Sequence, residues 1–315
     1  MNSSSGWRYQ CNKIESREYD LVMLIRSLLL ITFLCLIDKG YSEPSAKKTR
    51  ILPYNVWYGF TRVPDRKPAY LKWMKEQAPD IVSLQELNGY TEEKLSDDAK
   101  AWNHSHSVLL KTKGFPTGIT SREQIEDVQR SFEGFHHGLL RVRISGIYYY
   151  VIHLHPSNWE TRLRETKLIL KDIASLPKDS QVILAGDFNT FSSDDTKYYQ
   201  HRKLEPFFSK RDEKYGEKNL RDGKLDFSVI NHFKKAGLID LENSKRKADF
   251  VFSGSFPTKI EKAGDHGSAR RLDYIFATSD LAKRTTRAET IATDTSWILS
   301  DHLPVIVEIE QKPSK

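Results

Sequence analysis

Short apolar runs recur along the chain and are separated by polar segments, several of which have the length of a helix. The runs are rich in Val, Ile, Tyr and Phe, which are the residue types that favour β-strands. We therefore expect nine strands, at residues 51–57, 80–86, 107–111, 138–144, 147–154, 181–187, 248–252, 272–278 and 303–310.

Between these runs lie segments whose apolar residues recur at helical spacing. In the longest of them, Asn158 or Ser157 is the candidate N-cap and Pro177 marks the end. The charged tract at residues 209–224 lacks such spacing, and we expect a surface loop there. Because strands and helices alternate along the chain, the pattern indicates an α/β fold. The expected helices span residues 65–79, 158–177 and 227–240.

The first 42 residues differ from the rest of the chain. An apolar run spans residues 27–37, follows Arg26 and precedes a Gly-Tyr-Ser triplet that ends at residue 42. The run is too short to span a bilayer comfortably, and its flanks are typical of a cleavable secretory signal. We therefore expect residues 1–42 to be an N-terminal extension and signal peptide, residues 43–315 to form one domain, and the protein to be secreted or periplasmic.

The composition is that of a folded, soluble protein, because 38% of the 315 residues are hydrophobic and 29% are charged. The formal net charge of +7 is spread along the chain, so it suits either an anionic substrate or ordinary solubility. Both cysteines, Cys11 and Cys35, lie in the predicted leader, which leaves the following domain without a disulfide or a thiolate metal site. No coiled-coil or other assembly signal is visible, so we expect a monomer.

Polar and titratable side chains stand at or next to the ends of six of the predicted strands. Each of them alone is typical of a turn or of a hydrogen-bonded structural residue. Ligands in α/β sheets bind at the carboxyl ends of strands, so we take all of these groups to lie at such ends and to meet there. Their mixture of carboxylate, amide and imidazole groups fits metal-assisted attack on a phosphate. The groups are Asn55; Gln85 and Glu86; His153 and His155; Asp187 and Asn189; and Asp273, Asp301 and His302.

Six motifs that contain these residues follow one another in a fixed order. They are Asn55, "QE" from Gln85, "HLH" from His153, "GDFN" from Gly186, "RLDYIF" from Arg271 and "SDHLPV" from Ser300. This ordered set resembles the endonuclease/exonuclease/phosphatase superfamily, which includes pancreatic deoxyribonuclease, exonuclease III-like repair enzymes, neutral sphingomyelinases, inositol polyphosphate 5-phosphatases and nocturnin-like deadenylases. The resemblance runs from about residue 51 to residue 310. It implies that residues 43–315 form a catalytic domain with a four-layer α/β sandwich, in which two packed, mostly antiparallel sheets are flanked by helices.

The resemblance also implies a metal site. Asn55, Glu86 and Asp301 supply hard oxygen atoms, which suit Mg²⁺, with Mn²⁺ as a possible substitute. By the resemblance, Glu86 is the central metal ligand, and Asn55 and Asp301 help to position the ion. Such an ion neutralises charge on a phosphate and on its leaving oxygen.

Catalytic roles for five further side chains follow from the same resemblance. Asp273 orients the imidazole of His302 and favours its charged form, so that His302 serves either as a general base or as a cationic clamp on the phosphate. Asp187 orients or activates the attacking water. Asn189 lies two residues on, on the same side of an extended chain, and donates to a phosphoryl oxygen. His153 contacts the phosphate opposite His302.

The motifs specify phosphate chemistry and leave open what the phosphate is attached to. We expect an exported, Mg²⁺-dependent phosphodiesterase that acts on nucleic acid. The alternatives are a phospholipid phosphodiesterase, a small-molecule phosphomonoesterase, a zinc enzyme that uses the pairs His104/His106 and His153/His155, and a non-catalytic binding module.

Substrate selectivity is expected in two long segments, residues 90–135 and 192–247, which we take to be loops. The second segment contains a basic, aromatic stretch at residues 197–211. That composition fits stacking on bases and tracking of a nucleic-acid backbone, binding of a lipid head group, or a helix with a buried aromatic face.

Overall fold

The structure is a computed structural model that describes residues 47–260 and 266–312. The predicted signal peptide, both cysteines and the predicted domain boundary at residues 42/43 lie outside the described residues. Among the described residues, no helix has the length and apolar character that crossing a bilayer requires.

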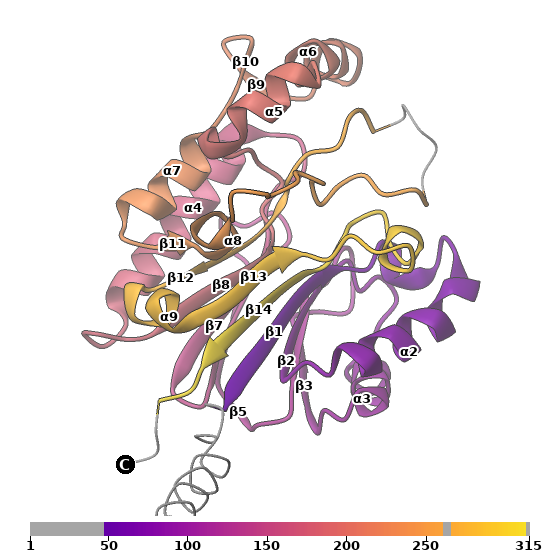
Figure 1. The fold of residues 1–315 in the computed structure, drawn as a ribbon, viewed down its shortest axis with the longest axis vertical. Coiled ribbons are helices and arrows are strands. Elements are labelled where there is room, and N and C mark those ends of the chain that lie inside the picture. Colours follow the sequence, from indigo (N-terminus) through magenta and orange to yellow (C-terminus); the bar gives the residue numbers. More distant parts are fainter. Residues whose placement is uncertain (1–46, 261–265, 313–315) are drawn as a thin grey trace, which may run out of the picture. The chain divides into compact units, whose positions relative to one another are not determined.

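Two six-stranded sheets form the centre of the fold (Figure 1). Within them, β1 runs parallel to β2 and β7 runs parallel to β8, whereas the other neighbouring strands are antiparallel. The expected pair of mostly antiparallel sheets is thus confirmed. The first sheet has the order β13 (Thr285–Thr290), β14 (Val305–Glu310), β1 (Lys48–Asn55), β2 (Ile81–Gln85), β4 (Gly118–Ser121), β3 (His106–Leu109). The second has the order β11 (Ile239–Asp240), β12 (Asp273–Ala277), β8 (Val182–Asp187), β7 (Ile147–His153), β6 (Leu139–Ile144), β5 (Ile125–Ser131).

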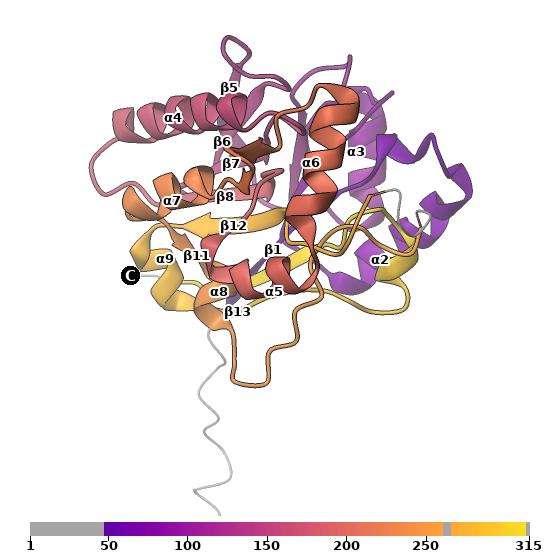
Figure 2. The ribbon, with the colours of Figure 1, turned by 90° about the horizontal axis from the view of Figure 1, so that it is seen from above.

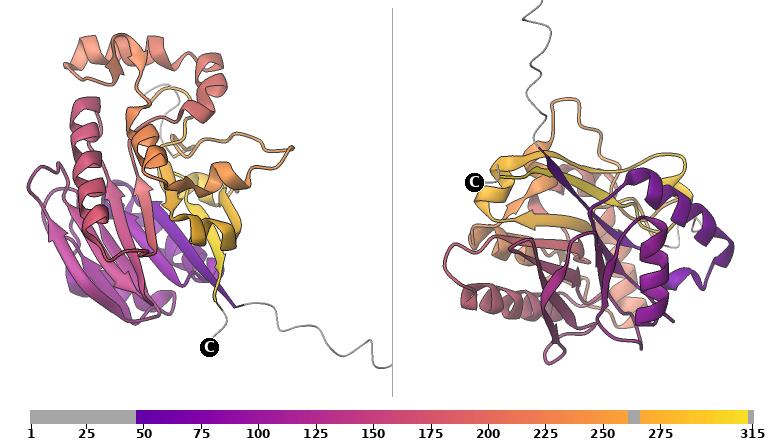
Figure 3. Two further views of the ribbon diagram at one scale, coloured as in Figure 1. Left: turned by 90° about the vertical axis from the view of Figure 1, so that its left-hand side faces the viewer. Right: turned by 90° about the horizontal axis from the view of Figure 1, so that it is seen from below.

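Helices cover the outer face of each sheet, which completes the four expected layers (Figures 1 and 3). The helices α2 (Lys67–Gln77) and α3 (Glu92–Ala101) cover the first sheet, and α4 (Trp159–Ser175) and α7 (Ser228–Lys235) cover the second. The other elements are α5 (Thr196–His201), α6 (Leu204–Tyr215), a hairpin of β9 (Leu220–Arg221) and β10 (Lys224–Leu225), α8 (Leu241–Lys245), α9 (Ser279–Arg284), and 3₁₀ turns at Tyr58–Phe60, Pro64–Arg66, Ser193–Asp195 and Ser296–Ile298.

Three apolar layers hold the sandwich together, one between the sheets and one between each sheet and its helices. Alternate side chains of a strand pack into two of these layers. In β1, Ile51 packs between the two sheets, while its neighbour Leu52 packs against the side of α2 and α3. In β8, Ile183 faces the other sheet, and Leu184 faces α4 and α7. Because both faces of these strands are buried, their sequences are continuously apolar, which is why they were recognisable as runs.

The three predicted helices are present, and each is shorter than predicted. Asn158 caps α4, since its side-chain oxygen accepts a hydrogen bond from the Thr161 amide at 3.1 Å. The third helix, α7, ends at Lys235 because the chain turns at Gly237, and the last residues predicted as helical form β11 instead.

Three sequence predictions are wrong. No strand forms at residues 248–252, because Phe250 and Phe252 pack into an aromatic cluster with α5 and α6. The tract at 209–224 holds the end of α6 and the β9–β10 hairpin, since α6 buries Phe208 and Leu204 against that cluster. The segments at 90–135 and 192–247 are not loops, because the first contains α3, β3, β4 and β5 and the second contains α5, α6, the β9–β10 hairpin, α7, β11 and α8.

Gly186 has the most demanding backbone position near the end of β8. Its φ is +139°, which L-residues rarely adopt. A Cβ there would lie 2.2 Å from the carbonyl oxygen of Ile152 in β7 and 2.7 Å from the Nε2 atom of Gln85. The glycine therefore lets β7 and the end of β2 approach β8 closely.

We predict that Gly186→Ala lowers the free energy of unfolding by more than about 3 kcal/mol, because it adds both backbone strain and a steric clash. Gly146→Ala is the matched control, since Gly146 also has a positive φ (+80°) but nothing lies within 4 Å of its Cβ position. That variant should lose on the order of 1 kcal/mol. Urea unfolding of both variants measures the difference, and equal losses would contradict the clash.

Candidate active site

The predicted site residues meet at one edge of the two sheets, but not all of them at carboxyl ends of strands. Asn55, His153 and Asp187 end β1, β7 and β8, as expected. Asp273, in contrast, begins β12, and Asp301 and His302 precede β14. Because β12 is antiparallel to β8 and β14 is antiparallel to β1, their amino ends reach the same edge. The expectation of carboxyl ends throughout is therefore wrong for these three residues.

The imidazole of His302 lies between two carboxylates. Its Nδ1 atom is 2.8 Å from Oδ2 of Asp273, and its Nε2 atom is 3.8 Å from Oδ2 of Asp187. All three side chains are buried. Burial alone would lower the pKa of His302, but the charges of Asp273 and Asp187 raise it to about 10. At neutral pH the ring therefore carries both protons and a positive charge.

Asp187 is the most contacted carboxylate of the site. Besides His302, its Oδ2 atom lies 3.2 Å from Nδ2 of Asn55 and 3.8 Å from Nε2 of His153. Its Oδ1 atom accepts a hydrogen bond from the backbone N–H of Asn189 at 2.8 Å. Burial raises the pKa of Asp187, and the charge of Asp273 opposes its ionisation further. A buried carboxylate with a raised pKa is suited to taking up a proton.

Asn189 does not continue the extended chain, contrary to the sequence interpretation. Its φ is +49°, so the backbone turns directly after Asp187. The side chain of Asn189 donates to the carbonyl oxygen of Leu154 at 3.0 Å. The residue still lines the same cavity as Asp187, because the turn brings it back over the strand end.

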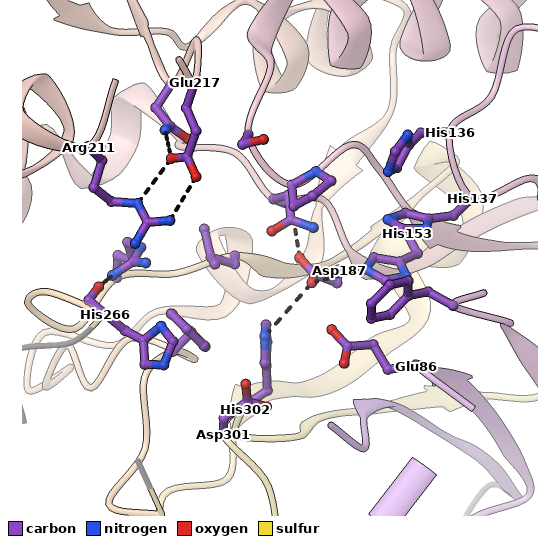
Figure 4. Close-up of a pocket in the computed structure, with 18 of the residues that line it drawn as sticks. Glu86, His136, His137, His153, Asp187, Arg211, Glu217, His266, Asp301 and His302 are labelled. Carbon is purple, nitrogen blue, oxygen red and sulfur yellow. Dashed lines mark hydrogen bonds and ion pairs between the residues drawn. The ribbon is translucent and has the colours of Figure 1, made fainter. Parts of the chain in front are cut away.

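Two further carboxylates, those of Glu86 and Asp301, enter the cavity from the first sheet (Figure 4). Glu86 has a φ of +59°, and its carboxylate accepts hydrogen bonds from the backbone N–H of Tyr58 at 3.0 Å and from Asn55 Nδ2 at 3.2 Å. Burial raises the pKa of Asp301, and the charge of Glu86 contributes to the rise.

These carboxylates fit a divalent cation. They are hard oxygen donors, and their mutual repulsion in a buried site is what a cation relieves. Within the described part of the chain, the group of side chains whose ligand atoms all lie within 4.8 Å consists of Asp187, Asp273 and His302. Glu86 and Asp301 line the same cavity and offer further carboxylate oxygens to a cation. Asn55 faces the carboxylates with its Nδ2, while its Oδ1 accepts from the Trp57 amide at 3.1 Å.

One side of the cavity is formed by histidines. The ring of His137 stacks on that of His153 with centroids 4.0 Å apart, and the ring of His136 lies 4.1 Å from that of His155. Burial lowers the pKa of all four, to about 4 for His155 and about 3 for His137. The rings are therefore neutral at neutral pH. Glu165 of α4 fixes them, because its carboxylate accepts hydrogen bonds from the backbone N–H groups of His136 (2.7 Å) and His155 (2.9 Å).

The other side of the cavity comes from the segment around α6. Arg211 and Glu217 lie across Asp187 and His302 from the histidines (Figure 4) and form a bidentate pair with distances of 2.8 and 3.0 Å. Phe208 and Arg270 also line this side. The cavity between the two sides has a volume of about 320 Å³, which is the size of a small-ligand site.

The predicted zinc alternative has no support from this geometry. Both ring nitrogens of His104 are bonded, Nδ1 to Thr120 Oγ1 at 2.8 Å and Nε2 to the carbonyl oxygen of Pro79 at 3.0 Å. His104 and His106 do not line the cavity that contains His153.

Comparison with known proteins places this arrangement in a family. The sequence profile of the Endonuclease/Exonuclease/phosphatase family matches residues 54–302. A sequence search of curated proteins gives no match. Similar solved structures include an AP endonuclease from Archaeoglobus fulgidus (19% identity, TM-score 0.60), the 3' phosphatase NExo from Neisseria bound to a product DNA hairpin (16%, 0.60), and D. rerio TDP2 with a single-strand DNA product (20%, 0.57). Each alignment covers 84% of this chain and 100% of the other.

The fold and the edge cluster are those of a metal-dependent phosphoric ester hydrolase. The chain belongs to the Endonuclease/Exonuclease/phosphatase family, and the expected deoxyribonuclease I-like sandwich is confirmed by its structural neighbours.

Several residues of the site were not predicted from the sequence. His136 and His137 lie between the segment at 90–135 and the predicted strand at 138–144, and two adjacent histidines before a glycine are a visible signal. Glu165 was hidden in a helix from which we expected an apolar stripe. Ser255 had no signal at all, yet its Oγ accepts hydrogen bonds from the amides of Leu272 (2.9 Å) and Asp273 (3.0 Å) and so fixes the start of β12.

We predict that Asp273→Asn lowers the pKa of His302, because it removes the carboxylate that does most to raise it. NMR titration of the His302 ring protons measures the shift. Since the folded-state pKa of about 10 exceeds the ordinary value of 6.5, the charged ring stabilises the fold fully below pH 6.5, and that contribution disappears as pH rises through 10. The stability difference between wild type and variant should shrink over this range.

The control for this titration is Asp97→Asn, which removes an exposed carboxylate of α3. It should leave the pKa of His302 unchanged. A wild-type pKa near 6.5 for His302 would contradict the assigned pairing.

We also predict that Mg²⁺ raises the melting temperature of the wild-type protein by several degrees, because binding to the folded state alone stabilises it. Glu86→Gln should lose most of this rise, whereas Glu93→Gln, which alters an exposed carboxylate of α3, should keep it. Differential scanning fluorimetry with Mg²⁺, Mn²⁺ or Zn²⁺ measures the effect. A full Mg²⁺ response in Glu86→Gln would exclude Glu86 as a ligand, and a response to Zn²⁺ alone would favour a zinc enzyme.

Proposed function

We propose that this protein is an exported, Mg²⁺-dependent phosphodiesterase that acts on nucleic acid. The observation that carries the proposal is the charged ring of His302 held between Asp187 and Asp273, in a cavity that Glu86 and Asp301 also enter. A fixed cation beside a carboxylate of raised pKa is the combination that phosphate hydrolysis by water needs.

The charge state of His302 decides between its two expected roles. A ring with a pKa of about 10 is already protonated at neutral pH, so it cannot accept the proton of water. We therefore assign His302 as the cationic donor that binds a phosphate oxygen through Nε2–H. Its Nδ1–H remains bonded to Asp273, which fixes the plane of the ring.

Asp187 is then the residue that takes the proton from the attacking water. Its carboxylate is buried, its pKa is raised, and it lines the cavity beside His302. The side-chain Nδ2 of Asn55 and the backbone N–H of Asn189 donate to the two oxygens of this carboxylate and hold it in place. His153 is neutral and lies on the side opposite His302, where it can contact the phosphate through Nε2.

Glu86 and Asp301 would hold the Mg²⁺ ion, with Asn55 ordering the carboxylate of Glu86. When bound, the ion supplies positive charge to the phosphate and to the leaving oxygen. Mn²⁺ offers the same preference for oxygen ligands and is a suitable substitute.

Nucleic acid is the favoured substrate class for two reasons. The structural neighbours named above comprise an AP endonuclease and two proteins in complex with DNA products. The chain also carries a net charge of +7, which favours a polyanion. Export rests on the secretory pattern within residues 1–42, and we infer a monomer in the absence of any assembly signal in the sequence.

The test is cleavage of plasmid DNA by the protein from residue 43 onward, with Mg²⁺ and with an EDTA control. We predict nicking that EDTA abolishes and that His302→Ala lowers by at least about 100-fold, because it removes the fixed cation. His201→Ala, which removes an exposed histidine of α5, should keep full activity.

Undiminished nicking by His302→Ala would refute the assigned role of His302. If plasmid remains intact while a 3'-phosphorylated oligonucleotide releases phosphate, the enzyme is a phosphomonoesterase. If neither reacts and a phospholipid is cleaved, the nucleic-acid assignment is wrong.

A further inference from the structure

Arg270 is a buried arginine that forms no ion pair with a carboxylate of the described residues. Only 6% of its surface is exposed. Its Nη1 atom donates to the backbone carbonyls of His266 (2.6 Å) and Ser268 (3.1 Å), while its buried Nε has no hydrogen-bond partner. No carboxylate of residues 47–260 or 266–312 forms an ion pair with it. A buried charge in this state is costly unless something compensates it.

The adjacent residue, Arg271, shows how a buried arginine is usually neutralised by carboxylates. Arg271 is equally buried, but three carboxylates surround its guanidinium: Asp195 at 2.8 Å, Asp240 at 2.8 Å and Glu242 at 3.5 Å. The chain therefore neutralises one of two neighbouring buried arginines completely and leaves the other to aromatic rings and carbonyl oxygens.

Aromatic rings compensate Arg270 only in part. Its guanidinium lies 4.7 Å from the ring centroid of Phe256, 5.1 Å from that of Phe208 and 5.9 Å from that of Phe207. Such contacts favour the cation but do not neutralise it. Burial lowers the pKa of Arg270 to about 9, and the charge of Arg211 adds to the decrease, so the group stays charged at neutral pH.

The position of Arg270 relative to the reacting groups is fixed by one ring. Phe256 contacts His302 with a centroid distance of 4.7 Å, and it contacts the guanidinium of Arg270 at the same distance. An isolated bridge between the backbones of Phe256 and Arg270, with hydrogen bonds of 3.0 and 2.7 Å, holds this arrangement. His302 and Arg270 line the same cavity with a single ring between them.

Burial without a carboxylate is not unusual by itself in this protein. Arg66 donates to three backbone carbonyls, and Arg162 donates to that of His155. Neither of these lines the cavity, whereas Arg270 does. Arg211 lines it as well, but its charge is already matched by the bidentate pair with Glu217. Of these arginines, Arg270 alone combines an unmatched charge with a place in the cavity wall.

We propose that Arg270 binds a second anionic group of the substrate, the phosphate next to the scissile phosphate on a nucleic-acid strand. The inference rests on the proposed function and specifies how the same site selects its substrate. A guanidinium matches phosphate oxygens with its planar set of donors, and the anion would supply the negative charge that no carboxylate of the described residues gives to Arg270. Substrates with a neighbouring phosphate therefore bind more tightly than substrates with one phosphate only.

The test compares dithymidylate that carries only its internal phosphodiester with the same dinucleotide bearing an added 5'- or 3'-phosphate. Arg270→Gln in the full-length protein should raise KM by at least about tenfold for the phosphorylated dinucleotide that the wild type prefers. Its kcat for that substrate, and both constants for the unphosphorylated dinucleotide, should stay unchanged. Arg270→Lys, which keeps the charge, should recover part of the affinity.

The control variant is Arg202→Gln. Arg202 also donates to backbone carbonyls of this region, those of Ala269 at 2.7 Å and Phe252 at 3.1 Å, but it does not line the cavity. Arg202→Gln should therefore keep the wild-type preference for the phosphorylated dinucleotide. If Arg270→Gln impairs both substrates equally, or neither, Arg270 is a structural residue and the inference is overturned.

A binding measurement separates this inference from the proposed function. In an Asp187→Asn background, calorimetric titration with each dinucleotide measures affinity without turnover, and adding Arg270→Gln should remove the preference for the phosphorylated one. Equal affinities in the Asp187→Asn protein would overturn the inference even if the wild type proves to be a nuclease. Inorganic pyrophosphate is the second probe. If Arg270→Gln lowers the affinity for pyrophosphate but for neither phosphorylated dinucleotide, the assignment to a nucleic-acid strand is overturned.

Discussion

The site depends on one interaction, the imidazolium of His302 between Asp187 and Asp273. The register of β8 and β12 places these two aspartates directly opposite each other, at the buried ends of two adjacent strands of the second sheet. Like charges in that position destabilise a sheet, so the pair requires a cation between its members. His302 supplies it from the other sheet, just before β14. The interaction thus joins the two sheets at their reactive edge, and its charge balance sets the protonation states from which the proposed chemistry follows.

The two sides of the cavity differ in charge for structural reasons. On the first side, four histidine rings lie against one another, and burial lowers their pKa values and so keeps them neutral. On the second side, α6 and the segment before β12 bring arginines and aromatic rings to the opening, as the view in Figure 2 shows for α6 above the strand ends. A bound phosphate ester therefore meets neutral donors and acceptors in one direction and positive charge in the other. Under the proposed function, this asymmetry would orient an extended anionic substrate across the catalytic groups.

The sequence predicted the strands with two buried faces and the residues at their ends, because burial on both faces leaves a continuous apolar run and a polar residue then stands out. It failed where packing is aromatic and local. Phe250 and Phe252 have strand-like sequence surroundings but pack into the cluster around α5 and α6, and no pattern in the chain distinguishes the two outcomes. The direction of the strands was also invisible. Asp273, Asp301 and His302 belong to the edge only because β12 and β14 are antiparallel to their neighbours, and antiparallel pairing is a property of the assembled sheets.

Arg270 and Arg271 also show that the sequence alone does not predict how neighbouring residues are used. In the sequence they are an undistinguished basic pair before the LDYIF motif. In the fold, Arg271 ties α8 and the 3₁₀ turn at Ser193–Asp195 to the start of β12 through Asp240, Glu242 and Asp195, and this network gives it a purely internal role. Arg270, one residue earlier, is held in a bridge to Phe256 and so reaches the cavity instead. The shared motifs fix the phosphate chemistry at the strand edge. Selection of what surrounds the phosphate depends on residues such as Arg270, whose role only the packing of the neighbouring segments reveals.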